Sequence, residues 1–335
     1  MSKYEDNYRN LLLHVQTHGT KTVVRNGYTM RLLNQVLTAD LQEGMSDQGP
    51  HASRRLLMPM LTGRRLPWDG IKGELLAFIK GASKLEDFIK LGCNFWTANQ
   101  KDAMERGIVE AGDLGPIYGV QWRRFASANG DIPIDQLQRL VDGLKAYQAS
   151  LDAGKPEVPT SRRHLVTAWH PDEIEDMCLP PCHFAFQCHT EALYAYNDAD
   201  GPYIEGYKLH TTVFMRSADM VLGVPCDMAS YALLTHLLAL IVNMVPGTVT
   251  LMMSDCHIYG QHLEPVISWQ GPMSYVDQYL EQPTTELPSL WIKPYVAESV
   301  LGRGSLDTIA SYLQPEDFWL TGYEPSSNLK IPMVV

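Results

Sequence analysis

The chain has 335 residues, of which 45% are hydrophobic and 19% charged, and its formal net charge is −11. This composition is typical of a globular protein with one large domain or two small ones. The acidic balance and the absence of a basic stripe argue against duplex nucleic acid as a partner, although a local group of arginines can still bind a small anion.

The hydrophobic pattern predicts helices and strands in mixed order, and hence the α+β class with one large sheet in a single domain. Helices are expected over residues 4–18, 71–80, 85–91, 134–149 and 228–245. Strands are expected over residues 22–41 with a turn at Asn26-Gly27, and over 164–169, 183–189, 207–214, 248–253, 285–298 and 318–323. Residues 42–55, rich in Gly, Ser, Asp and His, are expected to form a loop or insertion.

Two features bear on where the protein works. The first residues are polar and charged and lack the apolar run of a signal peptide, so the six cysteines are predicted to be free thiols in a reducing cytoplasm. The longest apolar stretch, residues 229–245, contains His236 and Asn243 and is short for a span of ~20 residues. It is therefore expected to be a buried core helix and not a membrane segment.

Chemistry is concentrated in two short segments. In Leu179-Pro180-Pro181-Cys182-His183 the prolines fix φ and remove backbone donors, which predicts a rigid, non-helical entry to the thiol. In Arg216-Ser217-Ala218-Asp219 a cation stands beside a hydroxyl and a carboxylate. A nucleophile together with an anion-binding group indicates covalent catalysis on a phosphorylated substrate.

A competing interpretation of the cysteine-rich region is a metal site. Cys178, Cys182, His183, Cys188 and His189 are close in sequence, but they lack a paired Cys-x-x-Cys. If residues 183–189 form a strand, alternate side chains point to opposite faces. We therefore expect no metal.

Many ordered segments of the chain resemble the thymidylate synthase family. They are Arg25-Asn26-Gly27, residues 73–76, 112–119, Ser161-Arg162-Arg163, 179–183, 216–219, 223–234, 255–259, and the tail from Gly322 to Val335. The resemblance implies one catalytic domain over residues 1–335, with insertions near 42–55 and 190–206. It also implies a homodimer with a sheet face as its interface, and transfer of a carbon from 5,10-methylenetetrahydrofolate to C5 of a pyrimidine nucleotide.

The resemblance also assigns catalytic roles. A thiolate adding to C6 makes C5 able to attack an electrophilic carbon, and Cys182 is the candidate. Because a free thiol titrates near ~8.5, nearby cations must favour the thiolate. Glu74, expected to be buried with a raised pKa, is implied to move protons through ordered water, helped by Tyr118, His183 and Asp255.

Binding roles follow in the same way. The residues implied to hold the phosphate are Arg25, Arg162, Arg163, Arg216 and Ser217, with Arg162 and Arg163 coming from the other subunit. His257 and Tyr259, two apart on an expected strand, are implied to bind a sugar hydroxyl. The residues implied to contact folate are Trp96, Asp219, Leu222, Gly223 and the terminal carboxylate of Val335.

Position 227 departs from the synthases, which have Asn where this chain has Asp227. Cytosine presents an acceptor at N3 and a donor at N4, which suit a carboxyl group with a shared proton. Mispairing strands buried polar groups at ~1–3 kcal/mol each, about ten- to over a hundredfold in preference. Asp227 therefore favours cytosine.

Other departures concern the product. Met215 stands where the synthases usually have Gln, as in deoxycytidylate hydroxymethylases, while Cys226 replaces a Phe and Asn99 a Trp beside the folate. The changes at Cys226 and Asn99 could admit water to the folate pocket. The expected reaction therefore converts dCMP, methylenetetrahydrofolate and water into 5-hydroxymethyl-dCMP and tetrahydrofolate. The alternatives left open are a 5-methyl product, CMP as substrate, ordinary thymidylate synthesis on dUMP, and a catalytically silent binding protein.

Overall fold

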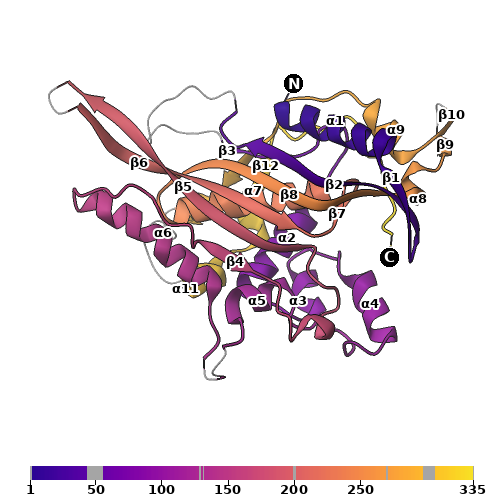
Figure 1. Cartoon of the computed structure of the whole chain (residues 1–335), viewed down its shortest axis with the longest axis horizontal. Coiled ribbons are helices and arrows are strands. Elements are labelled where there is room, and N and C mark those ends of the chain that lie inside the picture. The colour runs from indigo at the N-terminus through magenta and orange to yellow at the C-terminus, as the bar shows by residue number, and fades with distance from the viewer. Residues whose placement is uncertain are drawn as a thin grey trace.

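The computed structural model describes residues 2–43, 56–127, 130, 132–198, 201–268, 271–296 and 306–334. Its centre is a seven-stranded mixed sheet in the order β1-β2-β8-β6-β5-β4, with β7 beside β8 (Figure 1). The strands are β1 (Thr20–Val24), β2 (Gly27–Asp40), β4 (Leu165–Thr167), β5 (His183–Asn197), β6 (Gly201–Met215), β7 (Ala218–Asp219) and β8 (Val245–Tyr259). β6 and β7 run parallel to β8, and the other pairings are antiparallel.

Helices and short strands surround this sheet. The helices are α1 (Lys3–His18), α2 (Trp68–Lys80), α3 (Leu85–Lys90), α4 (Thr97–Glu105), α5 (Tyr118–Arg124), α6 (Gln136–Asp152), α7 (Gly223–Ile241), α8 (Gly260–Leu263), α9 (Tyr275–Leu280) and α11 (Leu306–Tyr312), with 3-10 turns at Ile174–Asp176 and Pro315–Asp317. The short strands are β3 (Leu56–Leu57), β11 (Ser289–Ile292) and β12 (Phe318–Thr321), which form one sheet, and the pair β9 (Val266–Ser268) and β10 (Gly271–Met273).

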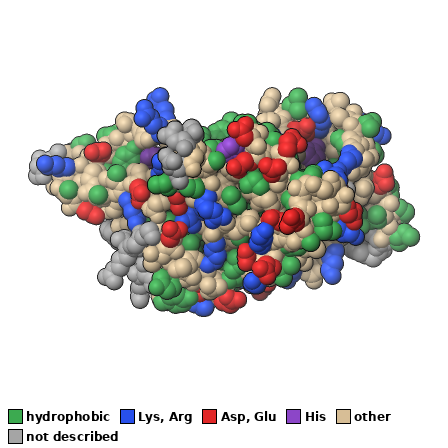
Figure 2. All heavy atoms as spheres, turned by 90° about the horizontal axis from the view of Figure 1, so that it is seen from below, with side chains coloured by type: hydrophobic (Ala, Val, Ile, Leu, Met, Phe, Trp, Pro, Cys, Tyr) green, Lys and Arg blue, Asp and Glu red, His purple; other side chains and the backbone are tan. Residues whose placement is uncertain are grey.

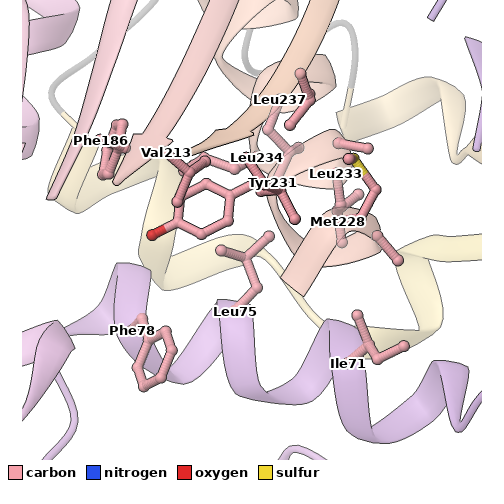
Figure 3. Close-up of a cluster of buried hydrophobic side chains, with 14 of the residues drawn as sticks. Ile71, Leu75, Phe78, Phe186, Val213, Met228, Tyr231, Leu233, Leu234 and Leu237 are labelled. Carbon is pink, nitrogen blue, oxygen red and sulfur yellow. The ribbon is translucent and has the colours of Figure 1, made fainter. Parts of the chain in front are cut away.

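Helix α7 is the centre of the hydrophobic core. It lies between the sheet and α2, so that Leu75 of α2 points toward Tyr231 of α7, with Phe186 and Val213 above them from the sheet (Figure 3). The helix is long and apolar enough to span a membrane, but 83% of that window is buried inside the fold. It is therefore a core helix, and it fixes the position of the residues at its N-terminus.

The opposite face of the sheet carries large apolar side chains in the open. Val36 and Met252 are direct partners across β2 and β8, and they are 56% and 43% exposed. Phe184 and Phe214 lie next to each other on β5 and β6, with ring centroids 6.4 Å apart. By contrast, the face seen from below has basic and acidic side chains interspersed (Figure 2). An apolar sheet face of this kind is typical of an interface.

The predicted α+β class with one large mixed sheet is confirmed, as are the helices near residues 4–18, 71–80, 85–91 and 134–149. The helix predicted over 228–245 begins earlier, at Gly223, and ends at Ile241, because Asn243 takes a positive φ of 53° and the chain enters β8 at Val245. The strand predicted over 285–298 is wrong in extent, since within the described part of that range, residues 285–296, only Ser289–Ile292 is a strand. Pro288 and Pro294 bracket it and cannot donate to a ladder.

The structure describes most of one of the two expected insertions and little of the other. Residues 190–197 and 201–206 lengthen β5 and β6 into a hairpin arm that projects beyond the helices (Figure 1). Of the expected loop 42–55, only residues 42 and 43 belong to the part of the chain that the structure describes.

Candidate active site

Cys182 immediately precedes β5 on a backbone held from two sides. The Arg216 amide donates to the Cys182 carbonyl at 2.9 Å, and its guanidinium donates to the carbonyls of Pro181 and Pro180 at 2.9 and 2.8 Å. The Cys182 amide donates to the Tyr118 hydroxyl at 2.7 Å. Because the two prolines offer no amide of their own, their carbonyls are free to orient the arginine. The half-buried thiol is thereby fixed beside a cation.

Opposing influences act on the pKa of the Cys182 thiol. Burial, the largest influence, raises the pKa of Cys182, while Arg216 and a hydrogen bond with Ser217 lower it and Asp227 and Asp219 raise it. The net pKa lies above that of a free thiol. The thiolate therefore needs further positive charge, or loss of the negative charge on the neighbouring carboxyls, before it is the dominant form.

His183 follows the cysteine and is held in a polar chain. Its Nδ1 lies 2.9 Å from the Tyr231 hydroxyl and its Nε2 lies 3.6 Å from Asp227 Oδ1. The ring stacks on Tyr118 with centroids 4.2 Å apart. Burial lowers the pKa of His183 to about 3, so the imidazole is neutral and offers one donor and one acceptor.

Asp227 lies in the first turns of α7, with a side chain only 17% exposed. Burial, followed by the charges of Glu74 and Asp219, raises the pKa of Asp227 well above its usual range. The protonated carboxyl group is therefore favoured. In that form Asp227 carries both a donor and an acceptor.

Glu74 reaches the same region from α2. It accepts a hydrogen bond from the Trp96 indole at 2.8 Å. Burial raises the pKa of Glu74 to about 7, and the hydrogen bond from Trp96 opposes part of that rise. Trp96 is only 5% exposed, and its ring lies 6.0 Å from that of Tyr118. A carboxyl group poised near neutral pH can both accept and release protons.

A cavity of about 360 Å³ lies beside Arg216, the cation that neighbours the Cys182 thiol. It is lined by Val24, Arg25, Asn26, Thr29, Arg31, Arg216, Ser217, Asp255, His257 and Tyr259. Arg25 comes from the turn between β1 and β2, Arg216 and Ser217 from the end of β6, and the last three from β8. One end of the cavity therefore gathers arginines and a hydroxyl, which suit a phosphate.

Apart from Trp96, the described folate candidates lie at or just before the start of α7. Leu222 and Gly223 begin that helix, and Asp219 precedes it on β7, where its carboxylate accepts from the Val221 amide at 2.9 Å. Val335 lies outside the described residues. Among the residues that the structure describes, no group of three or more His, Cys, Asp and Glu could hold a metal ion.

Arg162 and Arg163 are not brought into this cavity. Both are exposed on the segment before β4, and Arg163 lines a separate cavity of about 340 Å³ together with Arg139 and His164. Within one chain these two arginines therefore do not line the cavity that contains Arg216.

Of the site residues that were not predicted from the sequence, Tyr231 and Arg31 bear most on the chemistry. Tyr231 stands four positions after Asp227 on α7, a spacing that puts both on one helix face and could have revealed it. No pattern in the sequence indicates Arg31, because only the pairing register of β2 with β8 places it opposite His257.

The family comparison agrees with this geometry. A family model described as thymidylate synthase matches residues 6–335, which is nearly the whole chain and includes every element that lines the site. Members of this family carry out folate-dependent one-carbon transfer to C5 of a pyrimidine nucleotide. The chain belongs to the thymidylate synthase family.

Proposed function

We propose that this enzyme hydroxymethylates C5 of a cytosine nucleoside 5′-monophosphate, with Cys182 as the nucleophile. The observation that carries the proposal is Asp227. It is a largely buried carboxyl group, its pKa is raised by burial and by Glu74 and Asp219, and it lies 3.6 Å from the neutral His183. The synthases carry an amide at this position, and an amide N–H donates hydrogen bonds but is too weakly acidic to transfer its proton.

The base is read by Asp227. Its carbonyl oxygen accepts from the N4 amine of cytosine while its hydroxyl is directed at N3. As sulfur adds to C6, negative charge develops on N3, and the Asp227 proton can follow it. His183 lies beside the carboxyl group and is itself held by Tyr231, which keeps the pair in position.

The thiol is activated by its surroundings. Arg216 and Ser217 favour the thiolate. When the sulfur adds to C6, its negative charge passes through the ring to N3. The Asp227 proton then neutralises N3, so the charge ends on the Asp227 carboxylate. Glu74, with a pKa of about 7, then takes the C5 proton that must leave once the carbon has been added. Tyr118 holds the backbone of Cys182 throughout.

The residues present fit a folate. Trp96 supplies an aromatic side chain beside Glu74, with 5% of it exposed, and Asp219, on β7 before the N-terminus of α7, offers a carboxylate that can accept from pterin N–H groups. Methylenetetrahydrofolate supplies a carbon at the oxidation level of formaldehyde. Once C5 has bonded to that carbon and lost its proton, the carbon–nitrogen bond to the folate would break and release tetrahydrofolate. Water would then add at the carbon to give the hydroxymethyl group, and the Cys182 thiolate would leave C6 as the ring regains its double bond.

The two phosphate arginines missing from the cavity support a homodimer. The exposed apolar face of the sheet, with Val36 and Met252, is the proposed interface. It would bring the partner's copy of the segment before β4 to the cavity that contains Arg25 and Arg216. Such an assembly needs no membrane and no nucleic acid, and we place it in the cytoplasm.

The proposal is tested by product analysis. The purified protein is incubated with methylenetetrahydrofolate and either a cytosine or a uracil monophosphate, and the product is identified by mass. We expect a cytosine product heavier by CH₂O, with release of tetrahydrofolate. A gain of CH₂ with dihydrofolate would replace hydroxymethylation by methylation, and turnover of dUMP alone would contradict the role of Asp227.

A further inference from the structure

Arg31 places an additional cation in the nucleotide cavity. It stands on β2 directly opposite His257 of β8, and its Nη1 lies 3.3 Å from Asp255 Oδ2. The side chains of Arg31 and Asp255 are 35% and 31% exposed, and both line the cavity. This ion pair is therefore presented to the ligand and is not closed off inside the protein.

Asp255 connects this pair to the expected sugar-binding residues. Its Oδ1 lies 3.2 Å from His257 Nδ1, so the carboxylate holds the imidazole proton on Nδ1 and leaves Nε2 as an acceptor. Tyr259 packs edge-on against that ring, with centroids 5.2 Å apart. One sugar hydroxyl can therefore donate to His257 and accept from Tyr259.

The ion pair can serve a second hydroxyl. A guanidinium has five donors and only one of its nitrogens is directed at Asp255, while a carboxylate has about four acceptor positions. A carboxylate is also a known acceptor for ribose hydroxyls in nucleotide sites. A hydroxyl adjacent to the first could donate to Asp255 and accept from Arg31.

Resting on the proposed function, we propose that Arg31 and Asp255 recognise the 2′-hydroxyl, so that the preferred substrate is the ribonucleotide CMP. Without that hydroxyl the two side chains remain paired with each other. The site therefore favours ribose without rejecting deoxyribose, and we expect a preference for CMP over dCMP of about tenfold, as for one hydrogen bond to a charged group.

The test compares kcat/KM for CMP and dCMP in the wild type and in Arg31→Met, which keeps an unbranched side chain. We expect the variant to lose about tenfold with CMP and less than about threefold with dCMP. Lys90→Met is the matched control, because Lys90 also pairs with acidic residues, Glu86 and Asp87, but does not line the cavity. The control should keep the wild-type ratio, and a thermal unfolding scan checks that each variant is folded.

Calorimetric binding of CMP and dCMP, without folate, separates this inference from the proposed function. If CMP binds better and Arg31→Met removes the difference while no hydroxymethyl product forms, the sugar recognition stands and the proposed reaction fails. If the reaction occurs but the wild type does not prefer CMP, or Arg31→Met leaves the ratio unchanged, the inference is overturned.

Discussion

At the scale of single residues, the site is built around three carboxyl groups that share one low-dielectric region. Glu74 and Asp219 both raise the pKa of Asp227, so the three cannot all be ionised at little cost. Only the environment makes them different: Glu74 accepts from Trp96, Asp219 from the Val221 amide, and Asp227 stands beside a neutral histidine. Carboxyl groups held in different environments are what acid–base catalysis requires.

Replacing Asp227 by Asn should move base preference toward uracil. The amide of Asp227→Asn can match N3–H and O4 of uracil. In that orientation its NH₂ would face the N4 amine of cytosine, and an amide N–H is too weakly acidic to transfer a proton to N3. We expect kcat/KM for the cytosine nucleotide to fall at least about a hundredfold, with dUMP becoming the better substrate. Competition between the two nucleotides in one assay measures this directly, and an unchanged ratio would place base selection elsewhere.

Glu74 should make stability depend on pH. Its pKa is raised from 4.5 to about 7 in the folded chain, so the protonated form is the one that folding favours. This stabilisation is fully present below pH 4.5 and is lost as pH rises through about 7. The Glu74→Gln variant keeps an acceptor for Trp96 but cannot ionise.

We therefore expect Glu74→Gln to match the wild type near pH 5 and to be more stable by about 1–3 kcal/mol near pH 8. Denaturant unfolding at several pH values measures this difference. The same variant should lose turnover, since its amide cannot take the C5 proton. A difference in stability that is constant with pH would show that Glu74 does not titrate in this range.

At the scale of elements, the sequence predicts whether a segment is a helix or a strand better than it predicts the first and last residues of that segment. Core helices such as α2 and α6 have an apolar face at helical spacing, which local pattern alone reveals. The start of α7 was missed because Gly223 and Pro225 are poor helix formers, yet burial of the helix in the core overrides that propensity. The same limit applies to the site: the motif around Cys182 is local, whereas Arg31 is placed only by pairing between distant strands.

The hairpin arm offers a test of which part of β5 and β6 the fold needs. Beyond Leu193 the arm exposes Tyr194, Tyr196 and Tyr203, which are 59%, 72% and 49% exposed, and buries chiefly Ile204. Leu193 pairs with Gly206, so residues 194–205 can be replaced by Asn-Gly, a two-residue turn suited to a hairpin.

We expect this shortened chain to fold and to lose about 2 kcal/mol, the burial of one isoleucine. Denaturant unfolding gives the loss, and near-ultraviolet circular dichroism checks the tertiary structure. A loss of about 5 kcal/mol or more would mean that the arm contributes to the core through contacts beyond Ile204.

At the scale of the whole molecule, the open sheet face and the two displaced arginines have one common explanation. A sheet face with Val36 and Met252 half exposed needs a cover, and a phosphate cavity with Arg25 and Arg216 has room for more positive charge. In the proposed isologous dimer both needs would be met at once, because each chain would offer its partner the segment with Arg162 and Arg163. Each site would then contain residues of both chains.

Shared sites predict that two inactive variants restore each other. Cys182→Ser lacks the nucleophile but keeps both arginines, whereas a chain with Arg162→Ala and Arg163→Ala keeps the nucleophile but cannot serve its partner. After equal mixing and subunit exchange, half of the dimers combine the two chains, and each of these has one intact site. We therefore expect about a quarter of wild-type turnover, appearing at the rate of subunit exchange. Each variant mixed with itself is the control, and turnover that never exceeds these controls in dimers shown to have exchanged would mean that each site is built from one chain.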